Sequence, residues 1–274
     1  MVFASTELAA RIEGAECRLV AESTRAAAGP GREPFVRSLA GGVATLAGAG
    51  SPLNKVAGLG FAGPLEPHEL DDVEREFARR GQPVQVELST LADPAVGALL
   101  TERDYVLRGF EDVLGRAVAA DGPPPPGEVE VRRSPAEELD AWLQVVVDGF
   151  AAPDDQGLAS HEDFPREILE GVLRDMARAG GIDRYVALLD GAVAGAASMR
   201  LDGPIAQLCG AATLPAYRRR GVQTTLLAAR LAAAAAAGCE LAVMTALPGS
   251  KSHENAERRG FGLLYARAIL IREG

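Results

Sequence analysis

The spacing of apolar residues divides the second part of the chain into alternating strands and helices. Apolar side chains recur every three or four residues over 139–146 and over 169–176, a period that predicts two amphipathic helices. Asp190-Gly191 is a typical hairpin turn between two apolar stretches. The predicted elements are a strand at 128–132, a helix capped by Ser134-Pro135-Ala136-Glu137, a helix around 169–176, strands at 185–189, 192–201 and 205–214, a helix at 222–237, a strand at 239–245, a short helix at 251–259 and a last strand or strand pair at 261–271. This order is β-α-α-β-β-β-α-β-α-β.

The first part of the chain has a weaker pattern. Residues 8–26 are expected to be helical, and the Gly-rich stretch 43–60 has strand character. Leu70, Val73 and Phe77 form one face of a helix that ends at Gly81. Residues 84–88 alternate as a strand, and 105–114 form another.

A proline-rich segment, Gly122 to Gly127, separates the two parts. Four consecutive prolines favour an extended polyproline II spacer and offer no amide hydrogens to a sheet. The sequence therefore predicts two domains, 1–121 and 128–274, joined by a linker at 122–127. Each domain is long enough to bury its own core.

The two parts also show a weak internal likeness. Moving the sequence by 156 positions places Leu70 on Leu226, Leu88 on Met244 and Tyr105 on Phe261. The shared order is helix, buried strand, loop, short helix and strand, which indicates a structural repeat. An unrelated α/β cap is the alternative. The same shift places residues 62–67, which contain no arginine, where the second part has an arginine-rich loop.

Composition excludes several classes of protein. The chain of 274 residues has a formal net charge of −10, which argues against nucleic-acid binding and is weakly compatible with a cationic substrate. No apolar stretch is long enough to span a bilayer, and Met1–Ala10 lacks the pattern of a secretion signal. Three scattered cysteines and three scattered histidines predict neither disulfides nor a metal site, so a cytoplasmic location is expected.

The segment Thr213–Leu227 has the most specific chemistry in the sequence. A strand ends, three arginines follow, and a helix begins behind Gly221. The first amides of a helix lack internal partners and lie at the positive end of its dipole, where phosphate binds readily. Glycine allows close approach of the backbone, and arginines add charge-assisted hydrogen bonds. A solvated basic turn that caps the helix is the alternative interpretation.

This segment resembles the pyrophosphate-binding signature of GNAT acetyltransferases, Arg/Gln-x-x-Gly-x-Gly/Ala after a Val/Leu-Pro-x-Tyr strand end. Arg218 and Gly221 match it, whereas Gln223 replaces the last small residue. The order of elements and the pair Gly260-Phe261 before the final strand also resemble that family. The resemblance implies an α/β (α+β) fold with a mixed, mostly antiparallel sheet flanked by helices, in two tandem GNAT-like domains of which the first is a degenerate copy.

The resemblance also implies acetyl-CoA as cosubstrate and a deprotonated primary amine, of a small molecule or peptide, as the attacking acceptor. The backbone of Ala212, Thr213 and Leu214 is expected to bind the pantetheine arm beside a splayed neighbouring strand. The implied cofactor-binding residues are Ala212, Thr213, Leu214, Arg218, Arg219, Arg220, Gly221, Val222, Gln223, Thr224, Ser252 and Asn255.

The general acid is not identified by a motif. Many GNAT members have a tyrosine four residues before Gly-Phe, and that position here is Ala256. Tyr265 is the nearest alternative candidate, although a buried aromatic role on a strand also fits it. Cys209 and Cys239 lie in apolar strands and are expected to be core residues. The histidine and glutamate at 253 and 254 are expected to lie on a solvated helix face.

Two further hypotheses follow. The chain could be a non-catalytic acyl-CoA-binding or regulatory module, since the usual tyrosine is absent. The first part could instead recognise the acceptor. The expected partners are an amine acceptor but neither nucleic acid nor membrane, and the expected assembly is a monomer or homodimer.

Overall fold

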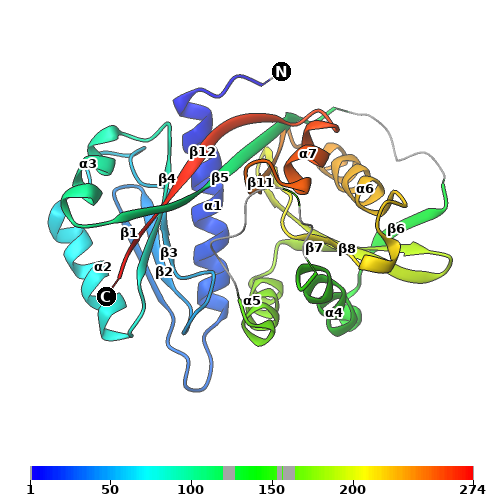
Figure 1. Cartoon of the computed structure of the whole chain (residues 1–274), viewed down its shortest axis with the longest axis horizontal. Coiled ribbons are helices and arrows are strands. Elements are labelled where there is room, and N and C mark those ends of the chain that lie inside the picture. Colours follow the sequence, from blue (N-terminus) through cyan, green and yellow to red (C-terminus); the bar gives the residue numbers. More distant parts are fainter. Residues whose placement is uncertain (1, 120–126, 153–155, 157–163, 274) are drawn as a thin grey trace.

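The computed structural model describes residues 2–119, 127–152, 156 and 164–273 (Figure 1). The predicted linker at 122–127 therefore lies outside the described residues, except for Gly127. The helices are α1 (Thr6–Ala26), α2 (Pro67–Arg79), α3 (Pro94–Glu102), α4 (Leu139–Phe150), α5 (Arg166–Ala179), α6 (Val222–Ala236) and α7 (Lys251–Glu257). The strands are β1 (Phe35–Leu39), β2 (Gly42–Leu46), β3 (Lys55–Ala57), β4 (Val84–Ser89), β5 (Val106–Ala117), β6 (Val129–Arg133), β7 (Ile182–Leu189), β8 (Ala192–Asp202), β9 (Ile205–Gln207), β10 (Ala211–Thr213), β11 (Leu241–Ala246) and β12 (Gly262–Arg272).

All strands join one mixed, mostly antiparallel sheet. Its order is β1-β2-β3-β4-β12-β5-β11-β9-β8-β7-β6, and β10 pairs with β8 beside this path. Among the strands of the described residues, only β3 with β4 and β9 with β11 pair in parallel. The expected fold class, a mostly antiparallel sheet flanked by helices, is confirmed.

The two parts of the chain exchange their last strands. The first part's last strand, β5, lies between β11 and β12, and the chain's last strand, β12, lies between β4 and β5. Figure 1 shows these two long strands crossing the middle of the molecule. The register between them shifts twice, leaving Arg108 on β5 and Leu264 on β12 as the extra residues. These bulges are 156 positions apart, as the internal likeness predicts for equivalent positions.

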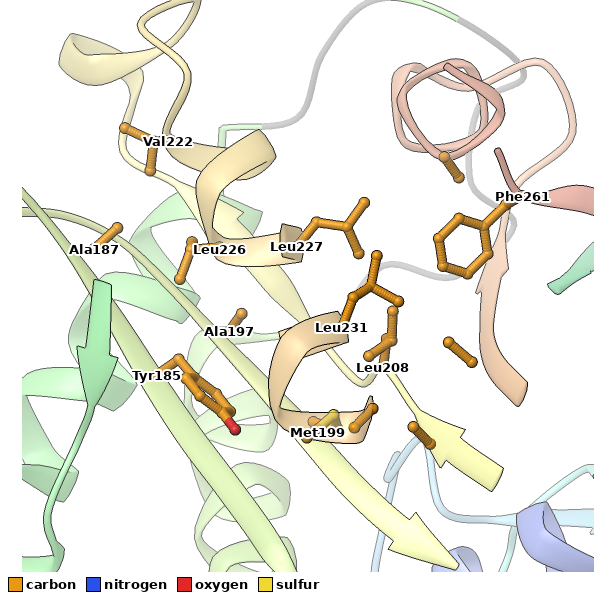
Figure 2. Packing of buried hydrophobic residues seen from close by; sticks show 14 of the residues in the cluster. Tyr185, Ala187, Ala197, Met199, Leu208, Val222, Leu226, Leu227, Leu231 and Phe261 are labelled. Carbon is orange, nitrogen blue, oxygen red and sulfur yellow. The ribbon is translucent and has the colours of Figure 1, made fainter. Parts of the chain in front are cut away.

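Helices cover both faces of the sheet. Helix α1 packs on one face through Ala9 and Ile12, which cluster with Val113 of β5. Helix α6 packs on the opposite face, where Leu114 points. Figure 2 shows Leu226, Leu227 and Leu231 of α6 in this packed layer. Helix α6 is therefore a rigid support for whatever its first turn binds.

Three details differ from the expectations drawn from the sequence. The stretch 205–214 forms two strands rather than one, because the chain turns away after Gln207. Ser134 does not cap a helix with Glu137; its hydroxyl lies 3.4 Å from Glu138, and a short 3₁₀ turn precedes α4. Strand β1 was not expected, since its side chains alternate too weakly.

Candidate active site

The strands β10 and β11 separate from each other at the place where the resemblance to GNAT proteins predicts a gap between two strands. Strand β9 pairs with β11 over Leu241–Val243, and the Leu208 amide still donates to the Val243 carbonyl at 2.8 Å. Beyond that point β10 pairs with β8, and no strand in the described ranges pairs with its other edge. Residues Met244–Ala246 and β10 therefore face each other without a hydrogen-bonded ladder.

A buried arginine stabilises the break between β9 and β10. The Ser198 amide donates to two successive carbonyls, of Cys209 at 3.2 Å and of Gly210 at 3.1 Å. The Arg230 side chain of α6, only 3 % exposed, donates to the carbonyls of Ser198 at 3.0 Å and Cys209 at 3.5 Å. Burial lowers the pKa of Arg230 to about 10. Arg230 was not predicted as a site residue, although it is a single arginine within the apolar run of this helix.

The loop before α6 offers a row of free backbone amides. Arg219 and Gly221 both have left-handed backbone, with φ of 63° and 83°, and no side chain caps the helix at Gly221. Among the described residues, no backbone amide from Arg219 to Thr224 donates a hydrogen bond. Alternating left- and right-handed residues at a helix N-terminus form an anion-binding concavity. Nothing lies within 4 Å of the place where a Gly221 side chain would stand, so a ligand can reach the backbone there. The loop fits a pyrophosphate.

The three arginines of the loop have different surroundings. Arg219 and Arg220 are exposed, and Arg220 pairs with Asp190 at 3.1 Å. Arg218 is half-buried and donates to the carbonyls of Thr213 at 3.4 Å, Gly149 at 3.5 Å and Ala152. Its guanidinium therefore contacts the C-terminal end of α4, which sequence reasoning did not anticipate.

Helix α7 contacts the first turn of α6. Asn255 donates to the Gln223 side chain at 2.6 Å, and Arg259 donates to the Thr224 hydroxyl at 3.0 Å. Ser252 is half-buried on the same helix, whose N-cap is Ser250. The structure thus brings Asn255 to the loop, together with Arg259, which sequence analysis did not select.

The remaining strand residues of the site lie on or next to β10. Ala212 is buried, and its β-carbon lies 2.5 Å from the position that a Gly149 side chain would occupy. The Leu214 amide donates to the Ala194 carbonyl at 3.0 Å. The close approach of α4 at Gly149 fixes β10 against one side of the parted strands.

Tyr265 is not brought to the loop. It is 4 % exposed on β12, on the face that α1 covers, and its hydroxyl donates to Glu13 at 2.7 Å. Burial, followed by the nearby Glu13 carboxylate, raises its pKa. Arg267 also donates to Glu13, at 2.9 Å, and to Glu111 at 3.0 Å. This buried network lies between α1 and the exchanged strands.

Other ionisable groups near the parted strands have their own partners. His253 is half-buried rather than solvated, because its Nδ1 lies 3.1 Å from Asp112 of β5. Burial raises the pKa of Asp112 and raises the pKa of the Cys209 thiol to about 12. Such a thiol stays protonated, which is consistent with a packing role.

Two general features of the molecule bear on its chemistry. No group of three or more His, Cys, Asp or Glu side chains in the described ranges is placed to hold a metal ion. None of the helices formed by the described residues is long and apolar enough to cross a membrane.

The region around the parted strands matches a known protein family. Residues 150–261 match the model of the Acetyltransferase (GNAT) family. Residues 150–261 correspond to a GNAT acetyltransferase domain. This domain includes the parted strands, the free amides before α6 and helix α7. Family membership implies acyl transfer from an acyl-CoA.

Solved structures share the fold over nearly the whole chain. A GCN5-related N-acetyltransferase from Kribbella flavida is 20 % identical, covering 97 % of this chain and 96 % of its own, with a TM-score of 0.66. A tandem GNAT protein from the clavulanic acid biosynthesis pathway is 15 % identical, covering 99 % and 97 %, with a TM-score of 0.62. A GCN5-related N-acetyltransferase from Sphaerobacter thermophilus is 13 % identical, covering 88 % and 76 %, with a TM-score of 0.57. These likenesses show the fold, and the expectation of tandem GNAT-like domains is confirmed. A comparison with curated proteins gave no match.

Proposed function

We propose that the chain is an N-acetyltransferase that moves an acetyl group from acetyl-CoA to a primary amine. The observation that carries the proposal is the row of free amides from Arg219 to Thr224 beside the parted strands. One site per chain is proposed, held by residues 128–274, with residues 1–121 contributing β5 beside it.

The proposed reaction uses three features of the described residues: the loop amides, the exposed arginines and the unpaired edge of β10. The amides of the loop and the charges of Arg219 and Arg220 attract the pyrophosphate. In the proposal, the unpaired edge of β10 forms backbone hydrogen bonds with the pantetheine amides, and an amide of this strand stabilises the oxyanion. Removing one such donor typically slows a reaction by about 100- to 1000-fold. The deprotonated amine attacks the thioester carbon, the C–S bond breaks, and the thiolate takes up a proton.

Asn255 and Ser252 are proposed to position the cosubstrate from α7. Asn255 holds Gln223, the residue that departs from the family signature, at 2.6 Å. This hydrogen bond ties the larger side chain of Gln223 to α7. In the proposal, Gln223 leaves the anion site open.

A second candidate function is a non-catalytic acyl-CoA-binding module. Two observations favour it: Ala256 stands where many members have a tyrosine, and Tyr265 is buried with its proton bound to Glu13. In the catalytic proposal the thiolate takes its proton from water or from the acceptor's ammonium, because CoA thiols are acidic enough to leave without a strong acid.

Two measurements test the proposals in turn. Calorimetry with acetyl-CoA should show binding at micromolar to millimolar concentration, and no binding to the folded chain refutes both functions. Release of free thiol in the presence of a panel of amines then separates an enzyme from a binding module. Arg219→Gln and Arg220→Gln should weaken acetyl-CoA binding, whereas Arg75→Gln, an exposed arginine on α2, should leave it unchanged.

A further inference from the structure

The edge of β5 continues beyond the end of β11. On that side β11 pairs with β5 only from Asp112 to Ala117, whereas β5 begins at Val106. The chain leaves β11 after Ala246 and enters α7, so β11 does not follow β5 further. Within the described part of the chain, no strand pairs with this edge of residues 106–111.

Apolar side chains are exposed along this edge. Val106, Leu107 and Phe110 are 52 %, 50 % and 44 % exposed. Native proteins usually blunt such an edge with proline, lysine or a covering segment, because it pairs readily with other extended chains. An exposed apolar edge of this kind is a candidate site for a partner strand.

The edge lies next to the parted strands. Asp112 is the partner of Ala246, the last residue of β11, so Glu111 is the first residue of β5 beyond the ladder. The cosubstrate's proposed place lies on the other side of the same residues, between β10 and Met244–Ala246. The exchanged strand and β10 thus flank the end of β11.

We propose that this edge binds an extended peptide by strand addition and presents the peptide's N-terminal amine to the acyl group. The proposal rests on the function proposed above. Both strands that pair with β5 are antiparallel to it. A peptide added in the same sense runs in the direction of β11, so its first residue lies opposite Glu111 and its α-amine lies beside Ala246.

The chemistry of the edge fits this acceptor. Glu111, the residue opposite which the peptide would begin, is half-buried and accepts from Arg267 of β12 at 3.0 Å. Phe110 is the next residue, so an apolar second residue is favoured. The register of β5 shifts at Arg108, so the regular part of the edge ends at Gly109.

An α-amine also suits a site without an evident strong base. Its pKa is about 7.7–8.0 against about 10.4 for lysine, so roughly a quarter of α-amines and roughly one lysine amine in a thousand are unprotonated near pH 7.4. The acceptor thus reaches its reactive form without help from Tyr265.

A second copy of this chain is the alternative occupant of the edge. A stable interface buries about 800 Å² on each partner and involves roughly 20–30 residues a side. Three half-exposed side chains on six residues of strand are much less than that. A short peptide matches this edge, whose regular part next to β11 is Gly109–Glu111.

Thiol release with acetyl-CoA tests the proposal on the full chain. Hexapeptides with a free N-terminus and Leu, Ala or Asp as second residue are compared with N-formylated peptides that carry an internal lysine. Free α-amines should be acetylated, with Leu best at the second position, and formylated peptides should not react. Methylating the backbone nitrogen of residue 3 or of residue 4, one of which faces β5, should abolish transfer in one of the two peptides.

Paired variants give a matched control. Leu107→Ser and Phe110→Ser should each raise the peptide's KM about tenfold by removing apolar contact, with acetyl-CoA affinity unchanged. Leu263→Ser is the control, because Leu263 is 55 % exposed at the equivalent position of β12, which borders the first part of the chain.

Other outcomes separate the two proposals. If acetyl-CoA does not bind, the proposed function fails. If small amines are acetylated but peptides are not, or if Phe110→Ser changes nothing, only the peptide site is refuted. If light scattering shows a dimer that Phe110→Ser dissociates, the edge belongs to a second copy and the peptide proposal is overturned.

Discussion

Helices α2 and α6 hold equivalent places in the two halves of the molecule but begin in opposite electrostatic environments. At α2, Glu66 and Glu69 form a capping box, in which the Glu69 carboxylate accepts from the Glu66 amide at 3.1 Å, and Pro67 has no amide hydrogen. At α6 the cap is Gly221, and the first turn has no acidic residue. Carboxylates cap the N-terminus of α2, whereas the uncapped N-terminus of α6 can bind an anion.

The strands beside these helices differ in the same way. In the first half, the Asp93 amide donates to the Gly60 carbonyl at 3.0 Å and ties the chain after β3 to the chain after β4. The Cys17 sulfur occupies the place where a Gly58 side chain would stand. In the second half, β10 and β11 part. The first half therefore has neither the uncapped helix nor the parted strands that the second half offers to an anion.

The contact that joins the chain after β3 to the chain after β4 in the first half should depend most strongly on the close approach at Gly60. Gly60 and Gly221 both have φ of 83°, but a side chain at Gly60 would lie 2.8 Å from the Asp93 nitrogen, whereas Gly221 has open space. Gly60→Ala should lower the free energy of unfolding by about 3–4 kcal/mol through crowding and strain, and Gly221→Ala by about 1–2 kcal/mol through strain alone. Urea denaturation measures both. Equal losses would contradict the idea that the first half is closed by contact at Gly60.

In the second half, the break between β9 and β10 should depend on the hydrogen bonds that Arg230 donates. Arg230→Met leaves the carbonyls of Ser198 and Cys209 without this donor and should cost about 2–3 kcal/mol of stability. Arg230→Lys keeps one charged donor and serves as the control. Denaturant midpoints compare the two, and an unchanged midpoint for Arg230→Met would show that the break in the strand does not need this arginine.

Giving α6 the acidic start of α2 should remove its anion site. Thr224 has the helix position of Glu69, so Thr224→Glu places a carboxylate among the free amides. The dissociation constant for acetyl-CoA should rise about 30- to 100-fold, equivalent to about 2–3 kcal/mol. Thr224→Gln has the same size without the charge and should bind nearly as well as the unchanged protein in calorimetry.

The exchanged strand should give the smallest effect, a dependence of stability on pH. Burial raises the pKa of Glu111 to about 7, above its value of about 4.3 in the unfolded chain. Ionised Glu111 is disfavoured in the fold, so its contribution to stability is complete below about pH 4 and is lost as pH rises towards 7. Glu111→Gln should flatten the decline in unfolding free energy between pH 5 and pH 7 by about 1–2 kcal/mol. If the unfolding free energy of Glu111→Gln declined with pH as steeply as that of the unchanged protein, the decline would not be due to Glu111.

The sequence indicated those parts of the site that depend on local order. Gly221 and the arginines predict a loop before a helix because the conformation of glycine and the helix dipole act over a few residues. The apolar periods of 222–237 and 239–245 correctly predict α6 and β11, and the shift of 156 residues anticipates the equivalent bulges at Arg108 and Leu264.

Features that depend on distant contacts could not be read from the sequence. Arg218 contacts Gly149 and Ala152 through tertiary packing, and Tyr265 meets Glu13 from the other end of the chain. The exchange of β5 and β12 was not predicted, because the apolar pattern of each strand is compatible with pairing in either half of the molecule. The roles expected for Ala212–Thr224, Ser252 and Asn255 in binding, and for Tyr265 in catalysis, remain predictions.

The crossing of β5 and β12 also limits how this protein can be divided. A gene that encoded only residues 128–274 would lack the strand between β11 and β12, leaving a gap in the middle of its sheet. The first half alone would lack β12, the strand that lies between β4 and β5. Residues 2–119 and 127–273 therefore build one continuous sheet together, and neither part alone keeps all of its strand neighbours.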